Sequence, residues 1–279
     1  MKILISVDIE GVAGVFHPEQ TRAGNTEYER ARRLMTAEAN AAIRGAFDGG
    51  ATSVLVNDSH GGFRNLLPDE LDPRARAVLG KPRVLGMMGG LEDEQGSRCD
   101  GVFMVGYHGK SQSRGVLAHT INSFAFARIW LNDAELGEAG LYGSLAAERG
   151  VPVLLASGDD VFAAETQPLF PQARFVVTKT AHGHASGVSL APKVACAAIE
   201  AAAREVLQQA GPVQRRPREI GKPPFACRLQ TQSPGMADLF AVLPGLERLD
   251  GVTVAFSKSS VEDVVRTLNS LSAMSAMLR

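Results

Sequence analysis

Two acidic side chains, Asp8 and Glu10, follow the first apolar run of the chain, residues 2–7. In an extended chain, residues two positions apart point to the same face, so the two carboxylates converge on one point. Two like charges held this close repel each other and need a cation beside or between them. The pair therefore predicts a metal site at the end of this run.

Metal-type side chains also follow two other apolar runs. His60 comes shortly after the run 53–56, and His108 comes shortly after the run 101–106. A single histidine after a strand is more often an ordinary loop or core residue. In open α/β sheets, however, ligands bind outside the carboxyl ends of parallel strands. Three runs that deliver such ligands to one sheet edge favour a metal site.

Glu138 opens a predicted helix, and alone it would be interpreted as an acid that complements the helix dipole. With the other acids and histidines it completes a set of five metal-type ligands. Five exceed the three protein ligands of a usual catalytic zinc, whereas a shared carboxylate suits two divalent ions about 3.5–4 Å apart. Imidazole suits zinc. We therefore expect a dinuclear site with the ligands Asp8, Glu10, His60, His108 and Glu138.

Four further polar side chains are weaker candidates for the site. His119 follows a polar loop rich in glycine and serine, the kind of segment that carries function. Lys110 and Arg114 in that loop could meet a substrate carboxylate, or could be solvated charges. Asp159 follows the apolar run 153–156 and could line the pocket or cap the next helix.

The elements that must position these residues form an α/β fold. Short runs rich in valine, isoleucine and leucine alternate with helical patterns, which indicates a mostly parallel central sheet, buried on both faces and flanked by helices. A small β-α-β-α lobe follows at the C-terminus. We expect a catalytic domain over 1–212, a basic connector near 214–218, and a lobe over 213–279 that could pack as part of the same domain. The expected strands are 2–7, 53–56, 101–106, 153–156, 175–178, 224–231 and 252–257, and the expected helices are 26–48, 191–209, 236–243 and one from 261.

Composition narrows the class of protein. The 279 residues carry a net charge of −1 with acids and bases well mixed, and with three Tyr and one Trp, so nothing favours nucleic acid or an anionic membrane. No run approaches the ~18 apolar residues of a membrane span, and the first run is too short for a secretory signal. Three widely spaced cysteines argue against a disulfide framework. We expect a cytoplasmic protein whose metals are held by oxygen and nitrogen.

Six motifs in the first 140 residues resemble, in type and order, those of the zinc D-aminopeptidases of the DppA type, peptidase family M55. The opening motif, with its Ser-x-Asp-x-Glu-Gly pattern, is unusual. The motifs are Ser6-Val7-Asp8-Ile9-Glu10-Gly11, Tyr28-Glu29-Arg30, Val56-Asn57-Asp58-Ser59-His60, Gly106-Tyr107-His108, Gly115-Val116-Leu117-Ala118-His119 and Gly137-Glu138-Ala139-Gly140.

The resemblance implies two zinc ions per subunit on the five expected ligands, with Asp8 as the bridge. It puts His119 at the family's catalytic histidine, described there as a nucleophile. A role in which water activated by zinc attacks while His119 moves protons or stabilises the oxyanion stays open. The resemblance also implies short peptide substrates and a ring-like homo-oligomer, such as a decamer, with sites facing an enclosed space.

One departure from the family pattern concerns substrate binding. His184 stands where the family carries an arginine, so specificity here could differ. His182 and His184 would share a face in an extended chain and could hold a metal, although such a pair is more often polar surface.

The sequence thus predicts a dizinc aminopeptidase that removes an N-terminal residue, D or L, from short peptides. Two alternatives stay open. One is another metal-dependent hydrolase, an amidase or phosphoesterase of small metabolites, because the ligands fix the metal better than the bond cleaved. The other is a non-catalytic domain that binds a metal or metabolite.

Overall fold

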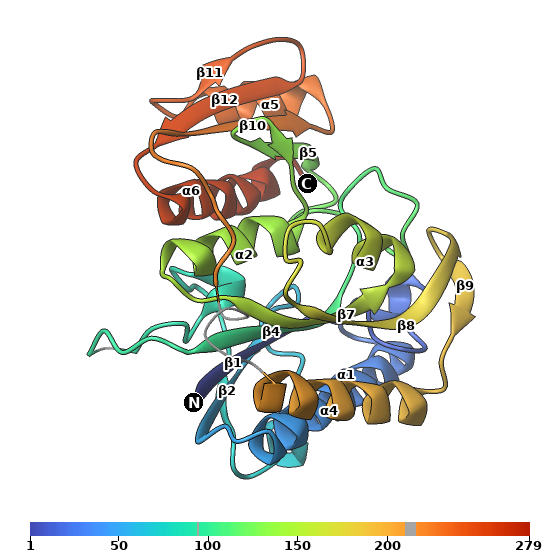
Figure 1. The fold of residues 1–279 in the computed structure, drawn as a ribbon. Helices are drawn as coiled ribbons and strands as arrows, with labels where there is room; N and C mark the ends of the chain where they lie inside the picture. Colours follow the sequence, from blue (N-terminus) through green and yellow to red (C-terminus); the bar gives the residue numbers. More distant parts are fainter. Residues whose placement is uncertain (94, 210–215) are drawn as a thin grey trace.

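Two sheets and the helices around them make up the fold (Figure 1). The computed structural model describes residues 1–93, 95–209 and 216–279. In this part of the chain a seven-stranded sheet has the order β3-β2-β1-β4-β7-β8-β9. Its strands are β1 (Lys2–Val7), β2 (Ser53–Asp58), β3 (Arg76–Val78), β4 (Gly101–Tyr107), β7 (Val153–Asp159), β8 (Arg174–Gly183) and β9 (Ser186–Ser189).

The larger sheet is parallel except at one edge, where β9 pairs antiparallel with β8. Strands β4 and β7 are buried along their whole length, as continuous apolar runs between two helical layers require. Helices α1 (Thr26–Asp48) and α4 (Pro192–Gln209) cover one face (Figure 1). Helices α2 (Glu138–Glu148) and α3 (Asp160–Thr166) cover the other. The predicted mostly parallel sheet flanked by helices is confirmed.

Local signals account for the boundaries of the long first helix. The Asn25 side chain accepts a hydrogen bond from the Tyr28 amide at 2.9 Å, which caps the amino end of α1. The helix stops at Gly49. The predicted span 26–48 is therefore confirmed, and it fixes how α1 lies beneath β1, β2 and β4.

The second sheet is antiparallel and has the order β11-β12-β10-β5-β6. Its C-terminal part contains the predicted strand, helix, strand and helix in that order, with the two-residue strand β11 added before β12. β5 and β6 come from the middle of the chain. β5 pairs with the C-terminal strand β10, a contact that the sequence pattern did not indicate, and β6 pairs with β5 at the edge of the sheet. Its elements are β5 (Phe126–Leu131), β6 (Ala134–Glu135), β10 (Phe225–Thr231), α5 (Pro234–Ala241), β11 (Glu247–Arg248), β12 (Thr253–Lys258) and α6 (Val261–Met274), and the 3-10 turns of the chain are Pro18–Gln20, Pro68–Glu70, Gly86–Met88 and Ser275–Leu278.

The boundary expected between 212 and 213, and the first part of the connector expected at 214–218, lie outside the described residues. A division of the chain at that point therefore stays a proposal. One apolar core joins the larger sheet to the second one, since Met104 of β4, Leu141 of α2, Leu268 of α6 and Leu229 of β10 belong to the same cluster. The second sheet is thus held on the α2 side of the larger sheet, with α6 packed against α2 (Figure 1).

Among the described residues, none of the helices has the length and apolar character needed to cross a membrane. The three cysteines, Cys99, Cys196 and Cys227, are free thiols.

Candidate metal centre

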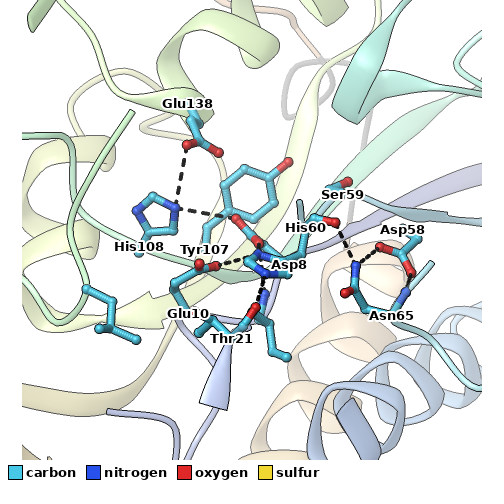
Figure 2. Close-up of polar contacts among 12 residues, drawn as sticks. Asp8, Glu10, Thr21, Asp58, Ser59, His60, Asn65, Tyr107, His108 and Glu138 are labelled. Atoms are coloured by element: carbon cyan, nitrogen blue, oxygen red, sulfur yellow. Dashed lines mark hydrogen bonds and ion pairs between the residues drawn. The ribbon is translucent and has the colours of Figure 1, made fainter. Parts of the chain in front are cut away.

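The predicted ligands gather where three adjacent parallel strands end (Figure 2). Asp8 follows β1, His60 follows β2 and His108 follows β4. Two glycines permit the ends of β1 and β4 to approach each other. A Cβ at Gly11 would lie 1.9 Å from the Tyr107 carbonyl oxygen, and one at Gly106, where φ is +71°, would lie 2.3 Å from the carbonyl oxygen of Asp8. Side chains at either position would push the ligand strands apart.

Asp8 lies at the middle of the cluster and presents its two carboxylate oxygens to different histidines. Its Oδ1 is 3.3 Å from Nδ1 of His60, and its Oδ2 is 3.4 Å from Nε2 of His108. The side chain is buried and nearly inaccessible to water. This is the arrangement expected of a carboxylate that can be shared between two ions.

Each histidine also faces a second carboxylate. Nδ1 of His60 is 3.1 Å from Oε2 of Glu10, and Nε2 of His108 is 3.7 Å from Oε1 of Glu138. The five predicted ligands thus form two pairs that meet at Asp8: Glu10 with His60 on one side, and His108 with Glu138 on the other. Glu138 opens α2, as expected, and it is buried.

The far nitrogen of each histidine is fixed by a backbone carbonyl. Nε2 of His60 donates to Thr21 O at 2.8 Å (Figure 2), and Nδ1 of His108 donates to Gly109 O at 2.9 Å. Once the ring is neutral, as metal binding requires, these bonds select the tautomer in which the nitrogen that faces the carboxylates carries a lone pair. Protein histidines that bind metal are oriented by such bonds, so both rings are prepared as ligands.

The electrostatics of the cluster require positive charge at its centre. Burial raises the pKa of Glu138. Burial would also lower the pKa of His108, but Glu138 and Asp8 outweigh it and raise that pKa to about 10. Burial likewise opposes the shift at Asp8, yet bonds from His108 and His60 hold its pKa well below the usual range. Without metal, the carboxylates thus keep the histidines protonated and positively charged. Divalent ions that displace those protons would supply the positive charge in their place.

Two buried atoms of the cluster, Oε2 of Glu10 and Nε2 of His108, have no hydrogen-bond partner among the described residues. Such orphaned atoms are costly unless something binds them. Ligand atoms of Asp8, Glu10 and His108 lie within 4.8 Å of one another, and so do those of His108, Glu138 and His119. His108 is common to these two groups of ligand atoms, whereas Asp8 is common to the ion pairs with His60 and His108. We favour Asp8 as the shared residue because a carboxylate has two oxygens to offer, whereas Nδ1 of His108 is already bonded to Gly109 O. The donor set suits zinc.

His119 lies beside this cluster and faces the same space. Its ring stacks on His108 with centroids 4.2 Å apart and planes at 11°, and its Nε2 is 3.6 Å from Oε1 of Glu138. Nδ1 donates to the Leu117 carbonyl at 3.0 Å, so Nε2 is the nitrogen free to exchange protons with a ligand. About 23% of the side chain remains exposed, unlike that of His108.

Asp159 has a structural role that supports the His119 loop. Its carboxylate accepts from the Val116 amide at 2.6 Å and from the Phe162 amide at 2.7 Å, which caps α3. This matches the alternative of a helix cap. The bond from the Val116 amide to Asp159 also fixes the backbone three residues before His119.

Asp58, in the same motif as His60, does not face the metal-type cluster. Its carboxylate accepts from the Asn65 amide at 2.5 Å, the Asn65 side chain at 2.7 Å and the Leu66 amide at 2.7 Å. Asn65 in turn donates to the His60 carbonyl at 2.6 Å (Figure 2). Asp58 therefore shapes the turn that carries His60.

Sequence reasoning missed a buried lysine beneath the loop that follows β1. The Lys179 ammonium donates to the carbonyl oxygens of Glu10 at 2.5 Å and Val12 at 3.0 Å, and also to that of Val15. Glu38 of α1 accepts from the amide of Ala13 in the same loop at 2.9 Å. Burial lowers the pKa of Lys179 to about 8 and raises that of Glu38 to about 7. The one available signal was a lysine that directly follows an apolar strand run.

We expect Lys179→Met to destabilise the protein by about 3 to 5 kcal/mol, because the loop carbonyls lose their donor and Glu38 loses its nearby positive charge. Zinc affinity should fall as well, since Glu10 lies on that loop. Thermal unfolding and zinc titration measure the two effects. The double variant Lys179→Met with Glu38→Gln should regain part of the lost stability. A Lys179→Met protein as stable as the wild type would show that Lys179 does not support the loop.

The remaining predicted substrate residues differ in position. His184 lines a cavity of about 1050 Å³ whose wall also includes Asp8, Glu10, His60, His119 and Glu138. Lys110 is 3.7 Å from Glu135, and Arg114 is exposed. Lys110, Arg114 and Asp159 are not among the residues that line this cavity. His182 and His184 belong to neither group of metal-type ligands found among the described residues.

Comparison with known proteins points in one direction. The profile of a family described as D-aminopeptidase, peptidase M55, matches residues 1–270. A D-aminopeptidase from Bacillus subtilis (strain 168) is 36% identical over 192 residues, which cover 69% of this chain and 68% of that protein. A solved structure described as the Zn-dependent D-aminopeptidase DppA from Bacillus subtilis, a self-compartmentalizing protease, has a TM-score of 0.92 and 29% identity, covering 99% of this chain and 98% of its own.

Proposed function

The chain belongs to peptidase family M55, the D-aminopeptidases, and on that premise we propose that it is a dizinc enzyme that removes N-terminal D-residues from short peptides. The observation that carries the dizinc proposal is the position of Asp8, whose two oxygens face His60 and His108 separately. Zinc is favoured over other ions by the two imidazoles and by the solved relative, which is described as Zn-dependent.

In this proposal Glu10 and His60 would hold one zinc ion, His108 and Glu138 would hold a second, and Asp8 would be shared between them. When bound, the ions would supply Lewis-acid activation of water and of the scissile carbonyl. A carboxylate near the metals would bind the free amine of the substrate and hold it beside the scissile bond.

His119 is proposed as the group that moves protons during cleavage. A new carbon–oxygen bond forms as the carbon–nitrogen bond breaks, so a proton must leave the attacking water and another must reach the leaving amine. Nε2 of His119 lies 3.6 Å from Glu138 and opens on the cavity. This position also permits the alternative in which His119 stabilises the oxyanion or attacks the carbonyl itself.

We further propose that the subunits form a ring-like homo-oligomer, such as a decamer, in the cytoplasm. The solved relative is described as self-compartmentalizing. Sites that face an enclosed space would admit short peptides and exclude folded proteins. Free thiols at all three cysteines are compatible with a reducing compartment.

Hydrolysis of D-alanyl-D-alanine, L-alanyl-L-alanine and p-nitrophenyl phosphate by the zinc-loaded protein tests this function. We expect release of D-alanine with kcat/KM at least about tenfold above that for the L-dipeptide, and no phosphate release. Preferred turnover of the phosphate ester would favour the phosphoesterase alternative. Loaded protein that cleaves no peptide, ester or amide would favour the non-catalytic alternative.

A further inference from the structure

The large cavity beside the metal-type cluster offers room for more than the scissile bond. Its volume of about 1050 Å³ is at the upper end of the range for small-molecule sites, so a peptide of a few residues fits. The smallest substrate, a dipeptide, carries a free carboxylate one residue beyond that bond. A carboxylate in a cavity is costly unless it is paired, so a cation in the lining away from the metal centre is its expected partner.

Four cationic side chains line the cavity: Arg22, Lys81, Arg83 and Arg279. Two of them already have partners. Arg22 is 3.3 Å from Glu19. Arg83 donates to the side chain of Asn57 and, at 2.6 Å, to the carbonyl of Asp58, which ties it to the end of β2. These contacts hold Arg83 at the end of β2, and Glu19 already offsets the charge of Arg22, so both offer less unpaired positive charge to the cavity than a lysine without an acidic partner.

Lys81 differs from both arginines. Among residues 1–93, 95–209 and 216–279, no carboxylate lies within ion-pair distance of its ammonium, and no hydrogen bond is formed there. The side chain is exposed, yet its Nζ lies 4.5 Å from the centroid of the Phe63 ring. The guanidinium of Arg83 lies over the same ring at 3.9 Å. Phe63 and Arg83 thus restrict where the ammonium can lie.

Lys81 is also within electrostatic reach of the cluster. Although the residue as a whole is exposed, partial desolvation of the ammonium by the surrounding protein lowers its pKa, the nearby Arg83 lowers it further, and Glu138 opposes that fall. An anion arriving beside Lys81 would relieve the repulsion from Arg83. The fourth cation, Arg279, packs against Phe124 with its guanidinium 5.0 Å from the ring centroid, and it is the competing candidate.

We propose that Lys81 binds the C-terminal carboxylate of dipeptide substrates and so favours dipeptides over uncharged analogues. The inference rests on the proposed peptidase function. Lys81 would thus determine substrate specificity, whereas His119 would transfer protons and the five predicted ligands would bind metal. The carboxylate pairs with the ammonium on the cavity side of Phe63, while the substrate's free amine lies beside the metal centre.

Paired substrates test this role: D-alanyl-D-alanine and D-alanyl-D-alaninamide, which differ only in the terminal charge. For the wild type we expect kcat/KM to favour the acid by about 10- to 100-fold, as one charge-assisted contact allows. Lys81→Gln should reduce that preference to about twofold or less, by raising KM for the acid while leaving the amide unchanged. Lys81→Arg should keep most of the preference.

Lys258→Gln is the matched control, since Lys258 also lies over a phenylalanine ring, Phe256 at 5.8 Å, but outside the cavity lining. It should keep the wild-type preference. Equal losses for acid and amide in Lys81→Gln, or no loss for either, would overturn the proposal. So would a loss of preference in Arg279→Gln alone. Wild-type protein that hydrolyses neither substrate would overturn the proposed function, and this inference with it.

Discussion

Replacing Asp8 by alanine is expected to lower kcat/KM for D-alanyl-D-alanine by at least ~10⁴-fold and to remove zinc from both pairs of ligands. The reason is the shared position of its carboxylate, 3.3 Å from His60 on one side and 3.4 Å from His108 on the other. Each ion supplies several kcal/mol of transition-state stabilisation, and every 1.36 kcal/mol is a factor of ten in rate. Metal analysis of the purified variant and steady-state kinetics measure the two losses.

Two further variants sharpen the assignment of Asp8. Asp8→Asn keeps the shape but loses the charge, so it should also fail to hold two ions. Asp159→Asn is the matched control: this acid is also buried at the carboxyl end of a parallel strand, but its oxygens accept from backbone amides. It should retain about two zinc per chain while losing thermal stability. An Asp8→Ala variant that keeps one tightly bound ion would show that Asp8 is not shared.

The parallel sheet was predictable because its signal is local. Each buried strand is a continuous apolar run, and each long helix begins or ends at a recognisable signal such as Asn25 or Gly49. The pairing of β5 with β10 was not predictable in this way, because Ile129 lies opposite Leu229 across about a hundred residues of chain. Nothing in either segment alone specifies that partner.

The ligand cluster was predictable for a similar reason. Asp8, His60 and His108 follow three strands whose carboxyl ends must meet at one edge of a parallel sheet. Glu10 converges on His60 although β1 ends at Val7, so the alternation of an extended strand is not what directs it. The bond from Lys179 to the carbonyl of Glu10 holds that part of the loop.

The supporting residues could not be found from the sequence because their roles depend on distant contacts. Lys179 reaches the loop after β1 from a strand almost 170 residues away, and Asp58 acts through Asn65. A lysine or an aspartate at such a position has the same local signature whether it supports the backbone or contacts a ligand. For the same reason Lys81 became a candidate only once the lining of the cavity was known.

His119→Ala is expected to lower kcat for D-alanyl-D-alanine by about 10²- to 10⁴-fold, the usual range for a lost proton-transfer group. KM should change little, because the ring lies beside the cluster and is not one of its five proposed ligands. Metal content should stay at about two zinc per chain. The measurements are steady-state kinetics and metal analysis on the same preparation, with thermal unfolding to show that the loop remains folded.

Metal content is the decisive readout for His119, because Nε2 lies near enough to Glu138 and His108 to act as a ligand instead. If His119→Ala loses one ion, the residue is a ligand and the proton-transfer assignment is wrong. His182→Ala is the matched control, since that histidine is exposed and belongs to neither ligand group, and it should keep wild-type kcat and zinc. A large fall in kcat at unchanged zinc content would separate catalysis by His119 from metal binding by its neighbour His108.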